Sequence, residues 1–150
     1  MDLSDLYSDR ILQLAANAPQ PGRLASAHAS ARKVSRLCGS SIEVDVAVEG
    51  GVITGYGQAL SACALGQAAA AVVAREIVGT PVAEFTNVRA QMVAMLKSQS
   101  DPPQGRWSDL ALLQAVRGYP ARHSSTLLVF DAVVEALEKA ESHPAVKADR

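Results

Sequence analysis

Two cysteines and a histidine are the residues of this chain best suited to metal or sulfur chemistry. The cysteines are Cys38 and Cys63, and the histidine is His123, one of three in the sequence. Thiolate sulfur and neutral imidazole bind soft and borderline metal ions, and a thiolate also attacks sulfur in exchange reactions. These residue types therefore predict a metal site or a sulfur-transfer site, provided that the fold brings them together.

Each of these residues also has a purely structural interpretation. Cys63 begins an alanine-rich segment, where it fits either as a small buried residue or as a thiolate favoured by the free amides of a helix N-terminus. His123 is interpreted either as a soft-metal ligand or as a surface histidine. Its neighbour Arg122 could hold an anion or stabilise a thiolate. The residue types alone leave these alternatives open.

The segment between the two cysteines predicts a β-hairpin. Apolar and acidic residues alternate over residues 42–48, and a second β-rich run, Val52 to Tyr56, follows Glu49-Gly50-Gly51. This pattern is typical of two strands joined at a Gly-Gly turn. A hairpin can bring its two flanks together, so we expect the thiols to be neighbours. The preceding residues 26–36 are interpreted as either a loop or a weak edge strand.

Helices are predicted on both sides of the hairpin. Apolar spacing favours a first helix from Asp2 to Ala18, which ends before a proline. The later helices are marked by capping and stop residues. We expect a helix over 62–78 with Ser61 as cap and Gly79 as stop, and another over 81–97 with Thr80 as cap and Pro81 at the first position. A short helix is expected over 109–116 with Ser108 as cap, and a last one from Ser124 or Ser125 onward. The tail after Ser142 is expected to fray.

The order of these elements predicts an α+β fold. Strands and helices occur in separate parts of the sequence, which is not the alternation of a parallel α/β fold. With 150 residues, the chain is expected to form one domain over residues 1–150.

Composition and missing motifs exclude several classes of function. The formal net charge is -1, from 14 basic and 15 acidic residues, so no nucleic acid partner is expected. No apolar stretch is long enough to span a membrane, and the acidic N-terminus does not resemble a signal peptide, so we expect a cytoplasmic protein. Neither the glycine-rich nucleotide-binding motifs nor the Gly-x-Ser-x-Gly hydrolase motif occurs.

Three segments together resemble the NifU/IscU-type iron–sulfur cluster scaffold family, and most closely its SufU-like branch. Leu37-Cys38-Gly39-Ser40 before the strand resembles the family's Cys-Gly-Asp motif. The segment from Ser61 to Ala69, which contains Cys63, resembles its Gly-Cys-Ala-Ile-Ser-x-Ala-Ser helix start. Pro120-Ala121-Arg122-His123-Ser124-Ser125 resembles its Arg-x-x-Cys segment. The resemblance implies a small antiparallel three-stranded sheet packed against several α-helices.

The family's metal site uses three cysteines and one aspartate. The matching positions in this sequence are Cys38, Ser40, Cys63 and Ser125, so hydroxyls stand in place of the aspartate and the third cysteine. His123 lies one residue before the place where a histidine is common in the IscU branch. A neutral hydroxyl is a poorer ligand for zinc or iron than a thiolate, an imidazole or a carboxylate.

The resemblance implies a role in iron–sulfur cluster assembly. Such a scaffold takes sulfur from a cysteine desulfurase, with Cys38 as the sulfur acceptor, and passes a transient cluster, of the [2Fe-2S] type, to acceptor proteins. Cys38, Cys63 and His123 would bind iron, and a homodimer sharing one cluster is a further expectation. Zinc, or no metal, are the alternative states of the site. A persulfide carrier without a stable cluster and an adaptor that binds no metal are the alternative functions.

Overall fold

A computed structural model describes residues 8–16, 22–25, 27–36 and 39–142 of the chain. Its elements are α2 (Asp9–Ala16), β1 (Ala29–Ser35), β2 (Ser40–Glu49), β3 (Val52–Ser61), α3 (Ala64–Glu76), α4 (Val82–Ser98), the 3-10 helices η1 (Gly105–Gly118) and η2 (Pro120–Arg122), and α5 (His123–Ser142). The three strands form one antiparallel sheet in the order β1-β2-β3. The expected α+β fold with a three-stranded sheet is therefore confirmed.

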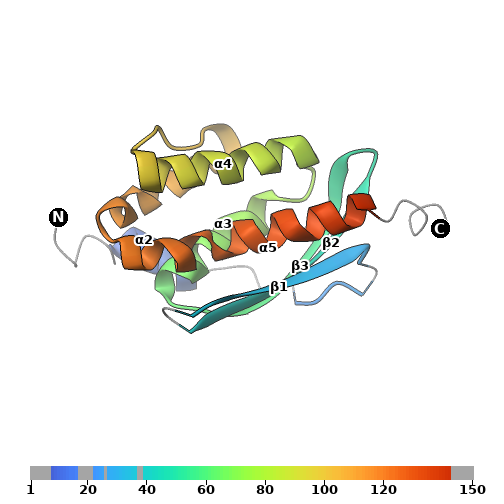
Figure 1. Ribbon diagram of the computed structural model, residues 1–150, viewed down its shortest axis with the longest axis horizontal. Helices are drawn as coiled ribbons and strands as arrows, with labels where there is room; N and C mark the ends of the chain where they lie inside the picture. Colours follow the sequence, from blue (N-terminus) through green and yellow to red (C-terminus); the bar gives the residue numbers. More distant parts are fainter. Residues whose placement is uncertain (1–7, 17–21, 26, 37–38, 143–150) are drawn as a thin grey trace.

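The sheet forms one layer, and α3, α5 and α4 are stacked on one side of it (Figure 1). The alternation over residues 42–48 explains this layering, because Ile42, Val44, Val46 and Val48 are all buried on the face that α5 covers. Helix α5 runs along β1, where Glu135 pairs with Lys33 and Lys139 donates to the carbonyl of Ser30. These two contacts join the C-terminal half of α5 to β1.

The predicted hairpin between β2 and β3 is confirmed. Gly50 and Gly51 have φ values of +59° and +78°, a left-handed conformation that glycine adopts without strain. Strand β3 runs past the predicted end at Tyr56 to Ser61. The ambiguous residues 26–36 contain an edge strand, β1, rather than only a loop.

Several predicted helix boundaries were wrong, and backbone pairing explains the main one. Ser61 was expected to cap α3, but it pairs with Ser41 as the last residue of β3, and the N-cap is Cys63. Pro81, rather than the expected Thr80, is the N-cap of α4, and the Thr80 hydroxyl donates instead to the carbonyl of Glu76.

The remaining helices also begin at other residues than expected. The helix predicted over 109–116 is a 3-10 helix of 14 residues, and the last helix begins at His123. Of the helix predicted from Asp2 to Ala18, the described part is α2. The predicted fraying of the tail falls almost wholly on residues 143–150, which lie outside the described residues.

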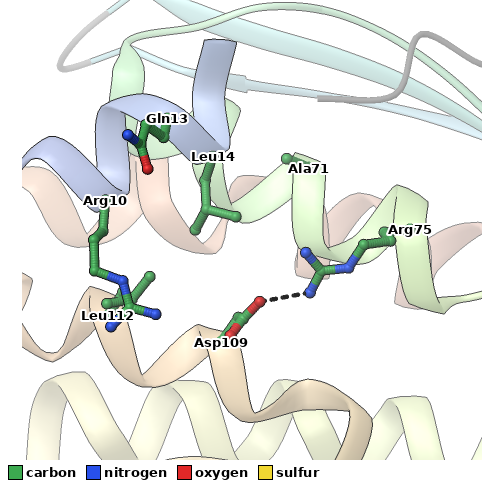
Figure 2. A pocket seen from close by; sticks show the side chains of 7 residues that line it. All are labelled: Arg10, Gln13, Leu14, Ala71, Arg75, Asp109 and Leu112. Carbon is green, nitrogen blue, oxygen red and sulfur yellow. Dashed lines mark hydrogen bonds and ion pairs between the residues drawn. The ribbon is translucent and has the colours of Figure 1, made fainter. Parts of the chain in front are cut away.

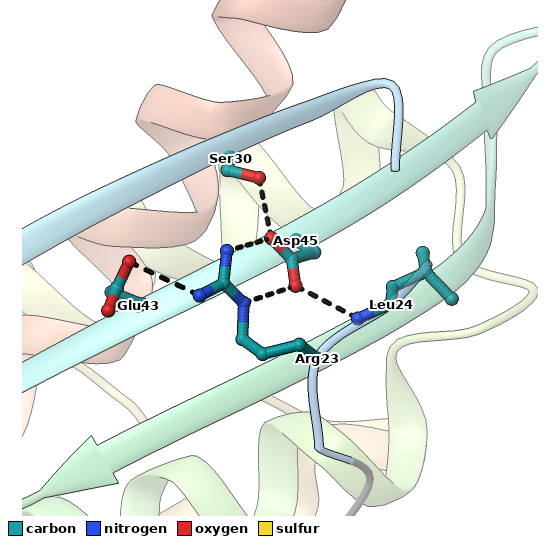
Figure 3. Close-up of polar contacts among 5 residues, drawn as sticks. All are labelled: Arg23, Leu24, Ser30, Glu43 and Asp45. Atoms are coloured by element: carbon teal, nitrogen blue, oxygen red, sulfur yellow. Dashed lines mark hydrogen bonds and ion pairs between the residues drawn. The ribbon is translucent and has the colours of Figure 1, made fainter. Parts of the chain in front are cut away.

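The outer face of the sheet is crossed by residues 22–24, which are held by Asp45 on the central strand. Asp45 is 1% exposed, although the alternation places it on the face opposite α5. Its carboxylate accepts hydrogen bonds from the Arg23 guanidinium at 2.6 and 2.9 Å, from the backbone amide of Leu24 and from the hydroxyl of Ser30 (Figure 3). These donors hold the pKa of Asp45 at about 2.

The close approach of this segment also explains a glycine in β3. A Cβ atom on Gly57 would lie 2.5 Å from the carbonyl oxygen of Gly22, so no side chain fits there. None of the described helices is long and apolar enough to cross a membrane.

We predict that Asp45→Asn destabilises the protein by about 2 kcal/mol at neutral pH. The pKa of Asp45 is lowered from its ordinary value of 3.8 to about 2, so the ionised carboxylate stabilises the fold above about pH 4. That contribution is lost as the pH falls toward 2. Urea unfolding of both proteins at a series of pH values measures the difference.

Glu43→Gln is the matched control, because Glu43 is the other carboxylate that contacts Arg23 but has a side chain that is 45% exposed. Its effect on the free energy of unfolding is expected to stay below about 0.5 kcal/mol. An Asp45→Asn effect of the same size at pH 7 and pH 2.5 would contradict the ionic origin of the stabilisation.

Candidate functional site

The residues around the predicted site come together at one end of the sheet. Ser35 at the end of β1 pairs with Ser40 at the start of β2, and Ser41 pairs with Ser61 at the end of β3. The turn between β1 and β2 and the exit of β3 therefore lie side by side. Cys38, in that turn of the sequence, lies outside the described residues.

Cys63 begins α3 directly after the sheet. It is the N-cap residue, with extended backbone angles, and its side chain makes no capping hydrogen bond. The side chain is partly buried and packs against the hydrophobic core. Its thiol donates to the Ser125 hydroxyl, with 3.7 Å between Sγ and Oγ. The structure thus joins the start of α3 to the start of α5.

Ser125 is held in a fixed position in the first turn of α5. It is 1% exposed, and its hydroxyl donates to the carbonyl of Arg122 at 3.1 Å. Ser124 points elsewhere: its Oγ lies 2.9 Å from the Oγ of Ser35 on β1. Ser40, also 1% exposed, lies on the face of β2 that α5 covers. Ser125 is therefore the hydroxyl that contacts the half-buried thiol.

The Cys63–Ser125 separation is that of a hydrogen bond from a thiol to a hydroxyl, and it is also close to the spacing of two sulfur ligands on one metal ion. In a tetrahedral site with metal–sulfur bonds of about 2.3 Å, two sulfur ligands lie about 3.8 Å apart. The observed 3.7 Å between Sγ and Oγ matches this edge. The spacing suits metal binding, although a hydroxyl is the weaker donor. Within the described ranges, no three His, Cys, Asp or Glu side chains are grouped as a metal site.

The His123 ring is buried, and Arg122 takes part in the first turn of α5 through its backbone. His123 is buried, so the surface-histidine interpretation was wrong, and its Nε2 lies 3.0 Å from the carbonyl oxygen of Val116. That bond fixes the ring toward η1, and metal binding through Nε2 would require breaking it. Arg122 contributes its backbone carbonyl, which accepts from both Ser125 and Thr126.

The chain matches the family described as the NifU-like N terminal domain over residues 6–126. This match spans the sheet, both sides of the site and the start of α5. The chain belongs to the NifU-like N-terminal domain family.

Individual relatives extend the comparison over nearly the whole chain. The iron-sulfur cluster assembly scaffold protein IscU of Thermotoga maritima is 26% identical over 134 residues, which cover 89% of this chain and 94% of that protein. The crystal structure of a nitrogen-fixing NifU-like protein (N-terminal) from Brucella abortus has a TM-score of 0.91 and 41% identity, covering 93% of this chain and 97% of the other.

A more distant solved structure shares the fold. It is a putative iron-sulfur cluster assembly scaffold protein for the SUF system from Fervidobacterium islandicum AW-1, with a TM-score of 0.82 and 20% identity. It covers 91% of this chain and 99% of the other. The predicted relationship to the NifU/IscU-type family is confirmed by the family match.

Sequence reasoning missed one contact of this NifU-like site. Ser35 was not singled out, yet its hydroxyl ties the β1–β2 end of the sheet to α5. The signal lay in the hairpin register: once residues 26–36 are assigned as a strand, Ser35 faces Ser40 across the turn. What the sequence could not supply is the packing of α5 that brings Ser124 to it.

We predict an energetic coupling between Ser35 and Ser124. Replacing each serine by alanine, singly and together, should give a coupling energy of about 1 kcal/mol in the free energy of unfolding, because the two hydroxyls form one hydrogen bond. The pair Ser35 and Ser125 serves as the control cycle, because Ser125 bonds to a backbone carbonyl instead. Equal coupling in both cycles would show that the bond is not specific.

Proposed function

We propose that this protein is an iron–sulfur cluster assembly scaffold, or an accessory to one, that binds iron or a nascent cluster through Cys38 and Cys63. The observation that carries the proposal is the 3.7 Å separation between Cys63 Sγ and Ser125 Oγ at two of the family's ligand positions. The name of the Thermotoga maritima relative supports the same activity. The cargo is a cluster of the [2Fe-2S] type, held transiently.

The donor set explains why the cluster is only transiently held. Two thiolates are strong ligands for iron, whereas the hydroxyls of Ser40 and Ser125 are neutral and weak. The Ser125 hydroxyl donates a hydrogen bond to the Arg122 carbonyl, so Ser125 keeps its proton and stays neutral. The remaining ligands come from outside the chain: a second subunit, a partner protein or a small thiol. A cluster bound in this way is exchanged easily, as its transfer to an acceptor requires.

Sulfur enters the site through Cys38 in this proposal. The Cys38 thiolate attacks the outer sulfur of a persulfide on a cysteine desulfurase, the sulfur–sulfur bond breaks, and the desulfurase thiolate leaves. Cys38 then carries the persulfide. Two molecules of a small thiol reduce it and are oxidised to a disulfide, so the outer sulfur is released as sulfide to the iron bound beside Cys63 and the Cys38 thiolate is restored. Partners are thus a desulfurase and cluster acceptors.

We predict that anaerobic reconstitution with iron(II), cysteine and a desulfurase produces a visible cluster absorption, and that Cys38→Ser and Cys63→Ser each abolish most of it. The reason is that each substitution removes one of only two strong ligands. Adding glutathione should raise the cluster yield of the unaltered protein, because it supplies outside ligands.

Iron and sulfide analysis beside the spectrum checks the result. Equal iron uptake in the Cys38→Ser, Cys63→Ser double variant would overturn the proposal. A persulfide on Cys38 without bound iron, seen by mass spectrometry, would favour the sulfur carrier instead. The absence of both persulfide and metal would favour the adaptor.

We also predict that Ser125→Cys tightens zinc binding by more than about tenfold. Loss of even an outer-shell partner of a metal ligand costs 10–100-fold in affinity, so restoring a direct thiolate ligand should gain at least as much. The new sulfur would lie near the position of Oγ, 3.7 Å from Cys63 Sγ. Adding Ser40→Asp should tighten binding further. Competition with a chromogenic chelator measures the affinity.

Ser124→Cys is the matched control, because it adds a thiol one residue away that faces Ser35 rather than Cys63. It should leave zinc affinity close to that of the unaltered protein. If Ser124→Cys tightened zinc binding as much as Ser125→Cys, the geometric basis of the site would be wrong.

A further inference from the structure

A cavity away from the thiol site lies between α2, α3 and η1. Its volume is about 300 Å³, at the lower end of the range of small-molecule sites. We call it the α2 cavity, and its lining residues are Arg10, Gln13, Leu14, Ala71, Arg75, Asp109 and Leu112. Figure 2 shows these side chains around the opening. The volume corresponds to about ten water molecules.

One part of the lining is apolar and comes from three different elements. Leu14 of α2, Ala71 of α3 and Leu112 of η1 form this apolar part. Ala71 is almost fully buried, and its small side chain leaves the space that a larger residue in α3 would fill. This surface favours a ligand with a hydrocarbon part.

The charged residues that line the cavity differ in whether they form ion pairs. Arg75 donates from Nε to Glu76 at 2.7 Å and from Nη2 to Asp109 at 2.8 Å, so its charge and that of Asp109 are already engaged in ion pairs. Arg10 forms no ion pair or hydrogen bond with any residue in the described ranges. Arg10 is therefore the charged group of the described lining that is left to bind a ligand, and its guanidinium N–H groups match a carboxylate.

We propose that the α2 cavity binds a small organic carboxylate. Its charged group is bound by Arg10, and its hydrocarbon part lies against the apolar part of the lining. A cation is disfavoured because the one carboxylate in the lining, Asp109, is already paired with Arg75. The bound molecule would bridge α2 to α3 and η1, so binding would stabilise α2 against the rest of the fold.

Titration of the full chain with straight-chain carboxylates from propionate to hexanoate, followed by amide NMR shifts, tests the proposal. The affinity should rise about fourfold for each added methylene group, as expected for burial of hydrocarbon. Shifts should be confined to resonances around Leu14, Ala71 and Leu112. Hexylammonium and inorganic phosphate should produce no such shifts.

Two variants connect the binding to the cavity. Arg10→Gln removes an exposed charge and should weaken hexanoate binding by about tenfold or more without loss of folding. Ala71→Leu should block the cavity while Arg10 is kept. Arg89→Gln on α4 is the control and should bind as the unaltered protein does, because Arg89 pairs with Asp131 outside this cavity.

Three results would overturn the proposal. They are equal binding of hexylammonium, unchanged affinity in Arg10→Gln, and no localised shifts up to tens of millimolar hexanoate. If hexyl phosphate bound tighter than hexanoate and depended on Arg10, the ligand would be a phosphate ester and the assignment to carboxylates would be wrong. Because Cys63 is not among the lining residues, Cys63→Ser should bind hexanoate normally. The result is therefore independent of cluster assembly.

Discussion

The register of strand β2 is the constraint on which the site depends. Ile42, Val44, Val46 and Val48 must face α5, because a slip of one residue would move all four from the core to solvent. With this register, the start of β2 at Ser40 and the end of β3 at Ser61 fall at the same end of the sheet. Burial of one apolar face thereby decides where the candidate site lies.

Helix α5, which packs on the apolar face of the sheet, completes this arrangement. Its ion pair with Lys33 and its bond to the Ser30 carbonyl align it along β1, and its first turn then meets the start of α3. The contact between Cys63 and Ser125 is the result of that alignment. The two residues are 62 positions apart, so only the packing of α5 and α3 on the sheet can set their distance.

At two positions that match the family's metal ligands, this chain has hydroxyl groups, which are weaker metal ligands than a carboxylate or a thiolate. Buried hydroxyls at positions 40 and 125 cost little when no metal is bound, since each can form hydrogen bonds inside the protein. Buried thiolates or a buried aspartate at these positions would carry charge that a metal ion or another cation would have to neutralise. The described part of the site is therefore satisfied by hydrogen bonds within the protein.

The sequence by itself determined the fold class and the hairpin, because alternation, glycine turns and the three motifs are local patterns. It also indicated the family, which the comparisons confirm. It misplaced the start of α3, since the pairing of Ser61 with Ser41 is a contact between distant residues. Burial of His123 and of Asp45, the Ser35–Ser124 bond and the α2 cavity were decided only by tertiary structure. Each depends on side chains brought together from elements far apart in the sequence, which no local spacing encodes.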